Sequence, residues 1–571
     1  MPDEDGPDAG MLVSDAVAQA LTELGADTAF GLVGSGNFHV TNALIARGTR
    51  FIAARHECGA ASMADAWARL TGRPGVLTLH QGPGLTNALT AITEAAKSRT
   101  PLLVLAADVS AAAKLSNFRI DVAAIAAAVG ATPARLHSAG LAVDDTVRAY
   151  RTAERERRCV VLALPLDVQA SECAWPGGGA GIAAAGPDAA AGAQDPAAVA
   201  GAPDQGAVTA LAEQLRRAER PVFVAGRGAR SSGAAARGEL ERLAAACGAL
   251  LATSAAAKGL FRGSPWDLDV SGGFATPLAA ELIRGADLVV GWGCSLNMWT
   301  MRHGTLIGAD AAVAQVDLDA AAIGAHRPVT LGVTGDVTAT ARAAAGLLEG
   351  TSEGYRTAAV GDRIAAEGRW RDVPFADDSH DGRIDPRTLT IALDDLLPAE
   401  RVVAVDSGNF MGYPSMYLSV PDEAGFTFTQ AYQSVGLGLG SAIGSAIARP
   451  DRLTVAALGD GGALMGASEL ETVVRLGLPM VIVVYDDEAY GAEVHHFGPD
   501  GYPLDTVRFP AADLAAIGRG YGCAGVTVRE PGDLDPVREW VAGPRDRPLV
   551  IDAKVTGDRG SWWLEEAFRG H

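Results

Sequence analysis

The sequence predicts an α/β protein made of three doubly wound domains, each a parallel sheet with helices on both faces. Short, continuous apolar runs such as GVLTLH and PLLVLAAD recur along the chain. Strands that are apolar on both sides belong to sheets that are covered on both faces. Amphipathic helical patterns separate these runs, and this alternation is typical of parallel sheets. Ligands of such sheets bind beyond the carboxyl ends of the strands, so we expect chemically active residues just after each strand.

Length and composition limit what the protein can be. The chain has 571 residues, of which 48% are hydrophobic, and this is enough apolar material for several buried cores. Lys and Arg total 47 against 68 Asp and Glu, so the formal net charge is −21. A nucleic-acid-binding protein needs a basic face, and we therefore expect no nucleic-acid partner. Backbone amides or a metal ion can still bind an anionic ligand in an acidic protein.

Two stretches of low apolar content divide the chain. Residues 173–206 contain a tract of Ala, Gly, Pro and Asp, which can bury little surface and is expected to be a flexible linker. Residues 347–384 form a second predicted linker, partly packed because it contains several aromatic side chains. The predicted domains are residues 10–172, 207–346 and 385–571.

The predicted elements repeat the same alternation in each domain. In the first domain, SDAVAQALTELG is an amphipathic helix that stops at a glycine, and TAFGLVG, GVLTLH and PLLVLAAD are strands. In the second, RPVFVAG, DLVVGWG and AVAQVDLD are strands between helices rich in Ala, Leu and Glu. In the third, RVVAVDSG, LTVAALGD, PMVIVVYDD and PLVIDAKV are strands. The C-terminal GDRGSWWLEEAFRGH is expected to be a helix that closes the domain or covers a site.

Cysteine usage and the N-terminal sequence point to a cellular compartment. The 6 cysteines form no CxxC pair, which in so long a chain indicates reduced thiols. The acidic start, MPDEDGPDAG, has no basic stretch followed by an apolar one, so no secretory signal is expected. No apolar run approaches the length of a membrane span. We therefore expect a cytoplasmic protein without a membrane partner.

The most informative stretch joins two strands of the third domain through a glycine-rich loop. Asp460 ends the first strand, and Asp486 and Asp487 end the second. A short right-handed crossover would make these strands neighbours, so their carboxylates would converge at one sheet edge, where carboxylate oxygens suit Mg²⁺. The alternative is an aspartate that caps a helix after a glycine turn. The glycines that would let the backbone approach a phosphate are Gly459, Gly461 and Gly462.

These residues resemble the cofactor motif of the thiamine-diphosphate enzymes, the family of acetolactate synthase, pyruvate decarboxylase and benzoylformate decarboxylase. The family motif begins with Gly-Asp-Gly and ends with Asn-Asn; here Asp487 follows Asp460 by 27 residues. The resemblance implies that Mg²⁺ is bound by the side chains of Asp460 and Asp487 and the carbonyl of Ala489, and that the metal holds the diphosphate. The chain departs from the pattern because Asp486-Asp487 replaces Asn-Asn, which would add negative charge beside the diphosphate.

The resemblance implies that residues 10–172 form a pyrimidine-binding domain, residues 207–346 a central domain and residues 385–571 a diphosphate-binding domain. It also extends to the rest of the cofactor. The carbonyl of Gln433 would accept a hydrogen bond from the aminopyrimidine. Val435 stands where the family has a residue that wedges the cofactor into a bent shape, although an ordinary core valine is the alternative. The residues expected at the cofactor are Glu57, Ser407, Gly408, Asn409, Gln433, Val435, Gly459, Asp460, Gly461, Gly462, Asp487, Ala489 and Tyr490.

Glu57 is the candidate activating residue. The sequence Arg55-His56-Glu57, followed by a helix of small residues, resembles the motif that carries the family's catalytic glutamate. A carboxyl group bonded to the pyrimidine ring favours the imino tautomer, whose nitrogen can remove the thiazolium proton, while the cofactor itself does the carbon chemistry. For this role Glu57 should be buried. The alternative is a glutamate that interacts favourably with a helix N-terminus.

Three residues are candidates for contact with a substrate. His80 in LHQGPGLTN aligns with a catalytic histidine of benzoylformate decarboxylase, and Ser35 in FGLVGS aligns with that enzyme's carboxylate-binding serine. Glu493, six residues after Asp487, matches a glutamate near the substrate of pyruvate decarboxylase. A histidine and a partly buried glutamate could relay protons. The alternatives are a structural histidine, a turn serine and a solvated glutamate.

The resemblance implies an enzyme that uses thiamine diphosphate and Mg²⁺ to act on a 2-oxo acid. We expect an acetolactate-synthase-like carboligase, which decarboxylates one 2-oxo acid and transfers the acyl group to a second carbonyl. The alternative, a simple decarboxylase that releases an aldehyde, is favoured by His80 and Glu493 and by the lack of the Gln-Trp pattern of acetolactate synthases after Asp487.

Two further alternatives concern the central domain and catalysis itself. The central domain binds FAD in some members of the family and nothing in others, so FAD stays undecided and a flavin-dependent oxidase is a further alternative. A non-catalytic homologue is suggested only by the Asp486-Asp487 departure. In the family, different subunits hold the two halves of the cofactor. The resemblance therefore implies a homodimer or homotetramer with active sites at the subunit interface.

Overall fold

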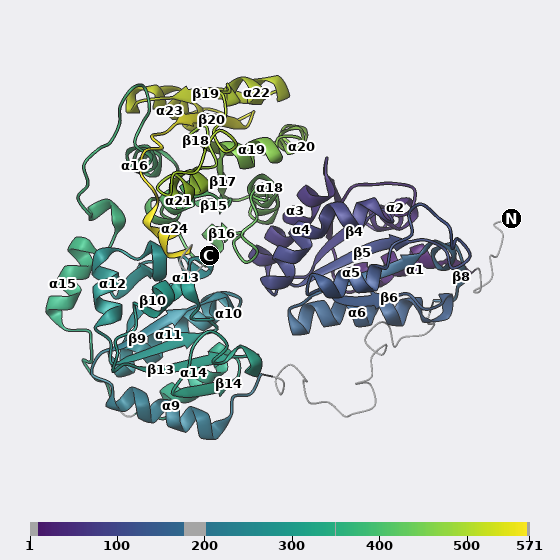
Figure 1. Ribbon diagram of the computed structural model, residues 1–571. Helices are drawn as coiled ribbons and strands as arrows, with labels where there is room; N and C mark the ends of the chain where they lie inside the picture. The colour runs from purple at the N-terminus through teal and green to yellow at the C-terminus, as the bar shows by residue number, and fades with distance from the viewer. Residues whose placement is uncertain (1–9, 176–200, 349, 568–571) are drawn as a thin grey trace. The chain divides into compact units, whose positions relative to one another are not determined.

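The computed structural model describes residues 10–175, 201–348 and 350–567 (Figure 1). The chain forms two compact units. Of the described residues, the first contains 10–175, 429–450 and 462–478, and the second contains 201–348, 350–428, 451–461 and 479–567. The first unit holds the N-terminal sheet, and the second holds the central and C-terminal sheets.

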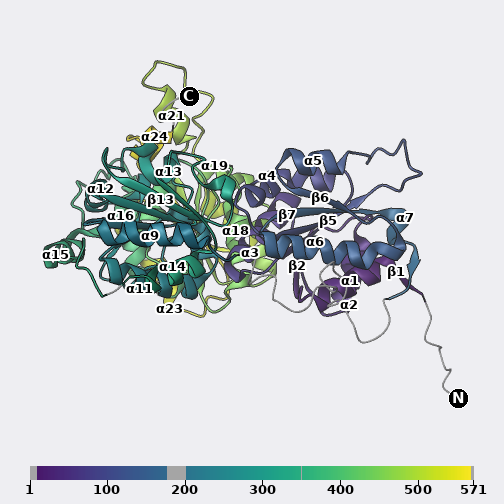
Figure 2. The same ribbon diagram turned by 90° about the horizontal axis from the view of Figure 1, so that it is seen from below.

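The N-terminal sheet has 6 strands, and every neighbouring pair is parallel. Helices α1 (Val13–Glu23), α2 (Phe38–Ala46) and α6 (Ala142–Glu156) share a core on one face, and α4 (Pro83–Lys97) and α5 (Val122–Ala128) lie on the other (Figures 1 and 2). A short antiparallel pair joins β1 (Met11–Leu12) to β8 (Glu172–Cys173). The strand order is β3 (Arg50–Ala53), β2 (Thr28–Gly31), β4 (Gly75–Leu79), β5 (Leu102–Asp108), β7 (Cys159–Pro165), β6 (Thr132–Arg135).

Helix α18 (Gly438–Ala448) belongs to the first unit and packs closely on α3 (Glu57–Thr71). A Cβ on Gly440 would lie 2.9 Å from Cβ of Ser62, and a Cβ on Gly444 would overlap the carbonyl of Met63. Glycine at these two positions therefore permits the close approach of the helices.

The central sheet also has 6 strands in parallel pairs. Helices α9 (Gln205–Arg217), α11 (Gly233–Cys247) and α14 (Val337–Gly346) share a core on one face (Figure 2). Helix α12 (Pro277–Arg284) packs on the other face together with α15 (Ala358–Glu367). The strand order is β11 (Asp267–Val270), β10 (Leu250–Thr253), β9 (Pro221–Ala225), β12 (Leu288–Trp292), β13 (Ala312–Asp317), β14 (Leu331–Thr334).

The C-terminal sheet repeats this architecture with 6 strands in parallel pairs. Helices α16 (Pro386–Leu396), α17 (Gly412–Tyr417) and α23 (Asp535–Ala542) contribute to the core on one face, and α22 (Leu514–Tyr521) packs against β19 and β20. The strand order is β16 (Phe426–Phe428), β15 (Arg401–Val405), β17 (Leu453–Gly459), β18 (Met480–Asp486), β20 (Leu549–Lys554), β19 (Ala524–Val528).

Three parallel sheets with helices on their faces confirm the predicted fold class. The second predicted linker, residues 347–384, contains α15, whose Ile364 is buried in the central core. Most of the first predicted linker, residues 173–206, lies outside the described residues, and α9 begins at Gln205. No described helix is both long enough and apolar enough to cross a membrane.

The 6 cysteines form no disulfide. Cys58 is partly exposed and the other five are buried. Each sheet domain contains at least one of the buried thiols, which are Cys159, Cys173, Cys247, Cys294 and Cys523.

Candidate active site

In the second unit, the two predicted metal-binding aspartates lie at the carboxyl ends of neighbouring strands. Asp460 follows β17 and is the first residue of α19 (Asp460–Met465), and Asp487 directly follows β18. Because β17 and β18 are adjacent and parallel, both side chains reach the same sheet edge, as their positions in the sequence predict. Asp460 accepts a hydrogen bond of 2.8 Å from the backbone N–H of Gly461.

The electrostatics of this edge favour a bound cation. Burial, with the nearby carboxylates of Asp460 and Asp486, raises the pKa of Asp487 to about 8. Burial also raises the pKa of Asp460 to about 6, against the lowering effect of its hydrogen bond from Gly461. Two buried, mutually repelling carboxylates are satisfied when a cation replaces their protons. The described residues contain no group of three or more His, Cys, Asp or Glu able to hold a metal.

Asp486 has different surroundings, which sequence reasoning did not foresee. It is 1% exposed and forms an ion pair with the Nζ of Lys554, from the neighbouring strand β20. The same Nζ lies 3.2 Å from a carboxylate oxygen of Asp552. A lysine therefore compensates the first of the two aspartates that replace Asn-Asn.

The loop after β15 brings Ser407, Gly408 and Asn409 to the same sheet edge. Oδ1 of Asn409 is buried and has no hydrogen-bond partner among the described residues. A Cβ on Gly491 would lie 2.5 Å from Oδ2 of Asp487 and 3.1 Å from Nδ2 of Asn409, so the two side chains are close together. Since the oxygen and nitrogen of an amide are assigned from their surroundings, the free end of Asn409 suits a phosphate oxygen or a water bound to a cation.

Close packing around the glycines completes this part of the site. A Cβ on Gly459 would lie 3.1 Å from the ring of Phe410, and one on Gly461 would lie 2.5 Å from the ring of Tyr490. Gly408 has φ = 143°, a conformation that favours glycine. Gly462 lies one residue further along α19. This backbone leaves room for a phosphate where side chains would stand, and the residues present fit a cation–diphosphate group.

In the first unit, Glu57 is the first residue of α3 and is 7% exposed. Its Oε2 accepts a hydrogen bond of 3.1 Å from Nδ2 of Asn87. Its Oε1 lies 3.8 Å from the position of a Cβ on Gly84, and Cβ of His80 lies 3.2 Å from the same position. Glu57, His80 and Asn87 are therefore neighbours, and the expected burial of Glu57 is observed. Sequence reasoning missed Asn87, although it belongs to the motif LHQGPGLTN.

His80 follows β4 and is fixed in a defined orientation. Its Nδ1 accepts a hydrogen bond of 3.1 Å from the backbone N–H of Gly36, and Phe118 packs edge-to-face on its ring at 5.2 Å. Burial lowers the pKa of His80, which favours the neutral ring with its proton on Nε2. Ser35 lies exposed in the turn between Gly34 and Gly36, beside this histidine. The carboxyl ends of β2, β3 and β4 thus bring Ser35, Glu57 and His80 to one edge of the N-terminal sheet.

Gln433 and Val435 also belong to the first unit, in the loop before α18. Gln433 has φ = 58°, which turns the backbone sharply, and Val435 is 37% exposed. The backbone N–H of Tyr432 donates a hydrogen bond of 2.6 Å to Oε2 of Glu94. Glu94 is itself buried and lies 2.8 Å from Arg69. Glu94 thus anchors the loop, and sequence reasoning missed it because it looks like an ordinary helix residue.

Glu493 lies on α21 (Gly491–Phe497) in the second unit and is partly buried. Its backbone N–H donates to the carbonyl of Tyr490 at 3.1 Å. The structure therefore brings Ser35, Glu57 and His80 together in the first unit, and Asn409, Asp460 and Asp487 together in the second.

Sheet domains whose glycine loops and carboxylates meet at strand ends define the class of α/β enzymes that bind a phosphorylated cofactor at a sheet edge. Comparison with known protein families identifies the family within this class. Residues 11–125 match the description "Thiamine pyrophosphate enzyme, N-terminal TPP binding domain", residues 208–344 the central domain and residues 406–553 the C-terminal TPP binding domain of the same enzymes. The chain belongs to the thiamine pyrophosphate enzyme family and is a thiamine-diphosphate-dependent enzyme.

Individual relatives span nearly the whole chain. A probable 2-ketoarginine decarboxylase of Pseudomonas aeruginosa is 31% identical over 94% of this chain and 92% of its own length. A sulfoacetaldehyde acetyltransferase of Castellaniella defragrans is 27% identical over 98% of this chain and 95% of its own. A catabolic acetolactate synthase of Raoultella terrigena is 26% identical over 95% and 94%, respectively. The family resemblance seen in the sequence is thus confirmed, and Mg²⁺ is the usual partner metal of thiamine diphosphate in this family.

Proposed function

We propose that this enzyme decarboxylates a 2-oxo acid and releases the corresponding aldehyde. The observation that carries the proposal is the pair formed by Glu57 and His80, which lie together at the edge of the N-terminal sheet. His80 accepts from Gly36 through Nδ1, so its Nε2–H can donate to a carboxylate or carbonyl oxygen of a substrate. This orients the 2-oxo acid and stabilises negative charge on that oxygen.

The residues of the site have separate roles in this proposal. Asp460, Asp487 and the carbonyl of Ala489 hold Mg²⁺, and Asn409 and the backbone of Gly408 contact the diphosphate. Asn87 fixes Glu57 through one carboxylate oxygen, so the other oxygen is available to hold a proton at the pyrimidine ring. Bound thiamine diphosphate supplies the carbon nucleophile and the electron sink. Glu493 is proposed to exchange protons with the substrate.

The fate of the substrate after loss of CO₂ separates the proposal from a second candidate. The relative at 31% identity is named a decarboxylase, and His80 and Glu493 match decarboxylase positions. Carboligation, the reaction that the sequence favoured, is the second candidate because an acetolactate synthase and a sulfoacetaldehyde acetyltransferase align over nearly the whole chain. We also propose a homodimer or homotetramer, which the mass of the protein in solution would test.

A panel of 2-oxo acids tests the proposal. The purified enzyme is supplied with thiamine diphosphate, Mg²⁺ and each acid in turn, including pyruvate, benzoylformate and 2-ketoarginine, and both CO₂ and the organic product are measured. We expect CO₂ with an equal amount of aldehyde, and loss of at least about 100-fold in turnover for Glu57→Gln. His137→Gln, at a histidine that pairs with Asp145, serves as the control. A ligated product instead of an aldehyde would establish the second candidate, and no turnover with any acid would overturn both.

A further inference from the structure

The chain between β20 and the last helix, α24 (Trp562–Ala567), contacts two residues of the proposed diphosphate site. A Cβ on Gly557 would lie 3.2 Å from Cβ of Asp487. Four residues later, Oγ of Ser561 donates a hydrogen bond of 3.0 Å to the carbonyl of Asn409. Residues 556–561, called here the C-terminal clasp, therefore lie against the side chain of Asp487 and bond to the backbone of Asn409.

His495 on α21 packs against the middle of the clasp. Its Cβ lies 3.3 Å from the position of a Cβ on Gly560, and its Nδ1 lies 3.7 Å from the same position. Nε2 of His495 is buried and has no hydrogen-bond partner among the described residues. Burial lowers the pKa of His495, which favours the neutral ring.

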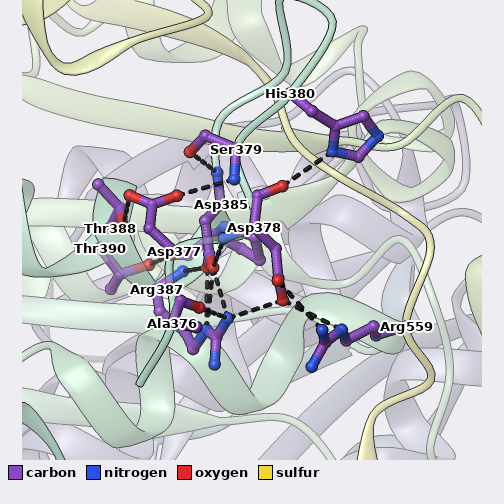
Figure 3. A network of polar contacts seen from close by, with 11 residues as sticks. Ala376, Asp377, Asp378, Ser379, His380, Asp385, Arg387, Thr388, Thr390 and Arg559 are labelled. Atoms are coloured by element: carbon purple, nitrogen blue, oxygen red, sulfur yellow. Dashed lines mark hydrogen bonds and ion pairs between the residues drawn. The ribbon is translucent and has the colours of Figure 1, made fainter. Parts of the chain in front are cut away.

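Two ion pairs hold the outer side of the clasp to the connector before α16. Nε2 of His380 lies 2.9 Å from a carboxylate oxygen of Asp558. Nη2 of Arg559 lies 3.1 Å from Oδ1 of Asp378, and Figure 3 shows Arg559 reaching this carboxylate from one side while Arg387 reaches it from the other. These pairs are exposed, so each contributes little alone, but they bind the outer face of a segment whose inner face touches Asp487.

We infer that the C-terminal clasp positions Asp487 and Asn409 for the cation and diphosphate, with His495 and Ser561 as positioning residues. Ser561 fixes the backbone of Asn409. The ring of His495 packs at Gly560, between the Gly557 contact with Asp487 and the Ser561 bond to Asn409. Outer-shell hydrogen bonds of this kind orient the groups that bind a metal. The inference rests on the proposed role of Asp487 and Asn409. It predicts that ligand binding and order in the clasp stabilise each other, because each restricts the same atoms.

The first test measures binding rather than turnover. Apo-protein prepared with EDTA is titrated with Mg²⁺ and thiamine diphosphate, and the intrinsic fluorescence, which includes Trp562 and Trp563, is followed. We expect Ser561→Ala and His495→Ala to weaken binding about 10-fold or more. His495→Phe should retain most of the affinity, since it keeps a planar ring packed at Gly560. Ser271→Ala is the matched control, because Ser271 is also 3% exposed and donates to a backbone carbonyl, that of Thr300, at 2.8 Å.

The second test uses the exposed side chain of Arg559. Trypsin cleavage after Arg559, identified by the mass of the C-terminal fragment, should be slowed when Mg²⁺ and thiamine diphosphate are both present. Equal cleavage with and without ligands, or unchanged affinity in both Ser561→Ala and His495→Ala, would overturn the inference. Asp460→Asn distinguishes failure of the inference from failure of the proposed function. If Asp460→Asn binds Mg²⁺ and thiamine diphosphate as well as wild type, the proposed metal site is wrong. If Asp460→Asn loses binding while Ser561→Ala and His495→Ala keep it, the metal site is supported and the proposed role of the clasp is wrong.

Discussion

At the scale of single residues, the two aspartates after β18 have opposite surroundings. Asp486 is paired with Lys554, whereas Asp487 has no ion-pair partner in the part of the chain that the structure describes. Their adjacency in sequence suggested one shared role. The two aspartates differ because Lys554, on the neighbouring strand β20, pairs only with Asp486 of the two. This lysine is separated from Asp486 by 68 residues. The convergence of Asp460 and Asp487 could be predicted because it depends only on adjacent strands, but a partner so distant in sequence could not.

The buried pair gives a prediction for Lys554→Met. Removing the lysine leaves Asp486 and Asp552, which are 1% and 0% exposed, without their cation. Loss of one partner of a buried pair costs about 3–5 kcal/mol, so the free energy of unfolding from urea denaturation should fall by about that amount. Asp486→Asn combined with Lys554→Met should recover part of the loss. Arg538→Met, which breaks only the surface pair with Asp535, is the control, and an equal effect of Lys554→Met and this control would contradict the prediction.

At the scale of elements, the sequence predicts the strands well and the placement of one helix poorly. Every strand named from an apolar run is present, because burial on both faces leaves a strong local signal. The glycine-rich stretch around α18 could be recognised as part of a cofactor motif, but its packing on α3 could not. That packing depends on which small residues meet across the two helices, such as Gly444 and Met63, and one sequence does not contain this information.

Gly444→Ala tests this helix contact. The added Cβ meets the Met63 carbonyl, so the helices must separate, and overpacking of this kind costs about 1–3 kcal/mol. Gly238→Ala is the matched control, since Gly238 is exposed in α11 and a Cβ there meets nothing within 4 Å. That substitution should stabilise by about 0.5–1 kcal/mol because alanine is the better helix former. Chemical denaturation measures both, and the same sign for both variants would refute the proposed close contact.

At the scale of the whole molecule, part of the acidity of the chain is concentrated at the candidate active site. The formal charge of −21 includes the carboxylates of Asp460 and Asp487, which have raised pKa values and are proposed to bind a cation. The family and the three-domain architecture could be derived from sequence alone, because motif spacing and strand patterns are local. Side chains that anchor the site, such as Asn87, Glu94 and Ser561, could not, since nothing in their immediate sequence distinguishes them from neighbours of the same type.

Metal removal should make thermal stability depend on pH. The pKa values of Asp460 and Asp487 are about 6 and about 8 in the folded protein, above the ordinary value near 4. The folded state therefore binds more protons than the unfolded state over this range, and the stability of the metal-free protein should fall as pH rises from about 4 to about 8. Mg²⁺ with thiamine diphosphate replaces those protons, so the increase in melting temperature that they cause should be larger at about pH 8 than at about pH 5.

Differential scanning fluorimetry with EDTA, and with both ligands, measures this difference. Asp487→Asn removes the group with the larger shift and should flatten the pH dependence of the metal-free protein. An increase in melting temperature that is the same at both pH values would contradict the prediction.

The distribution of thiols allows the unfolding of each domain to be followed separately. Cys159 and Cys173 belong to the N-terminal domain, Cys247 and Cys294 to the central domain, and Cys523 to the C-terminal domain, and all five are buried. Brief alkylation of the protein at a series of denaturant concentrations, followed by peptide mass analysis, would show the concentration at which each core opens. Cys58, partly exposed beside Glu57, would be modified first and would report on the active site before any domain unfolds.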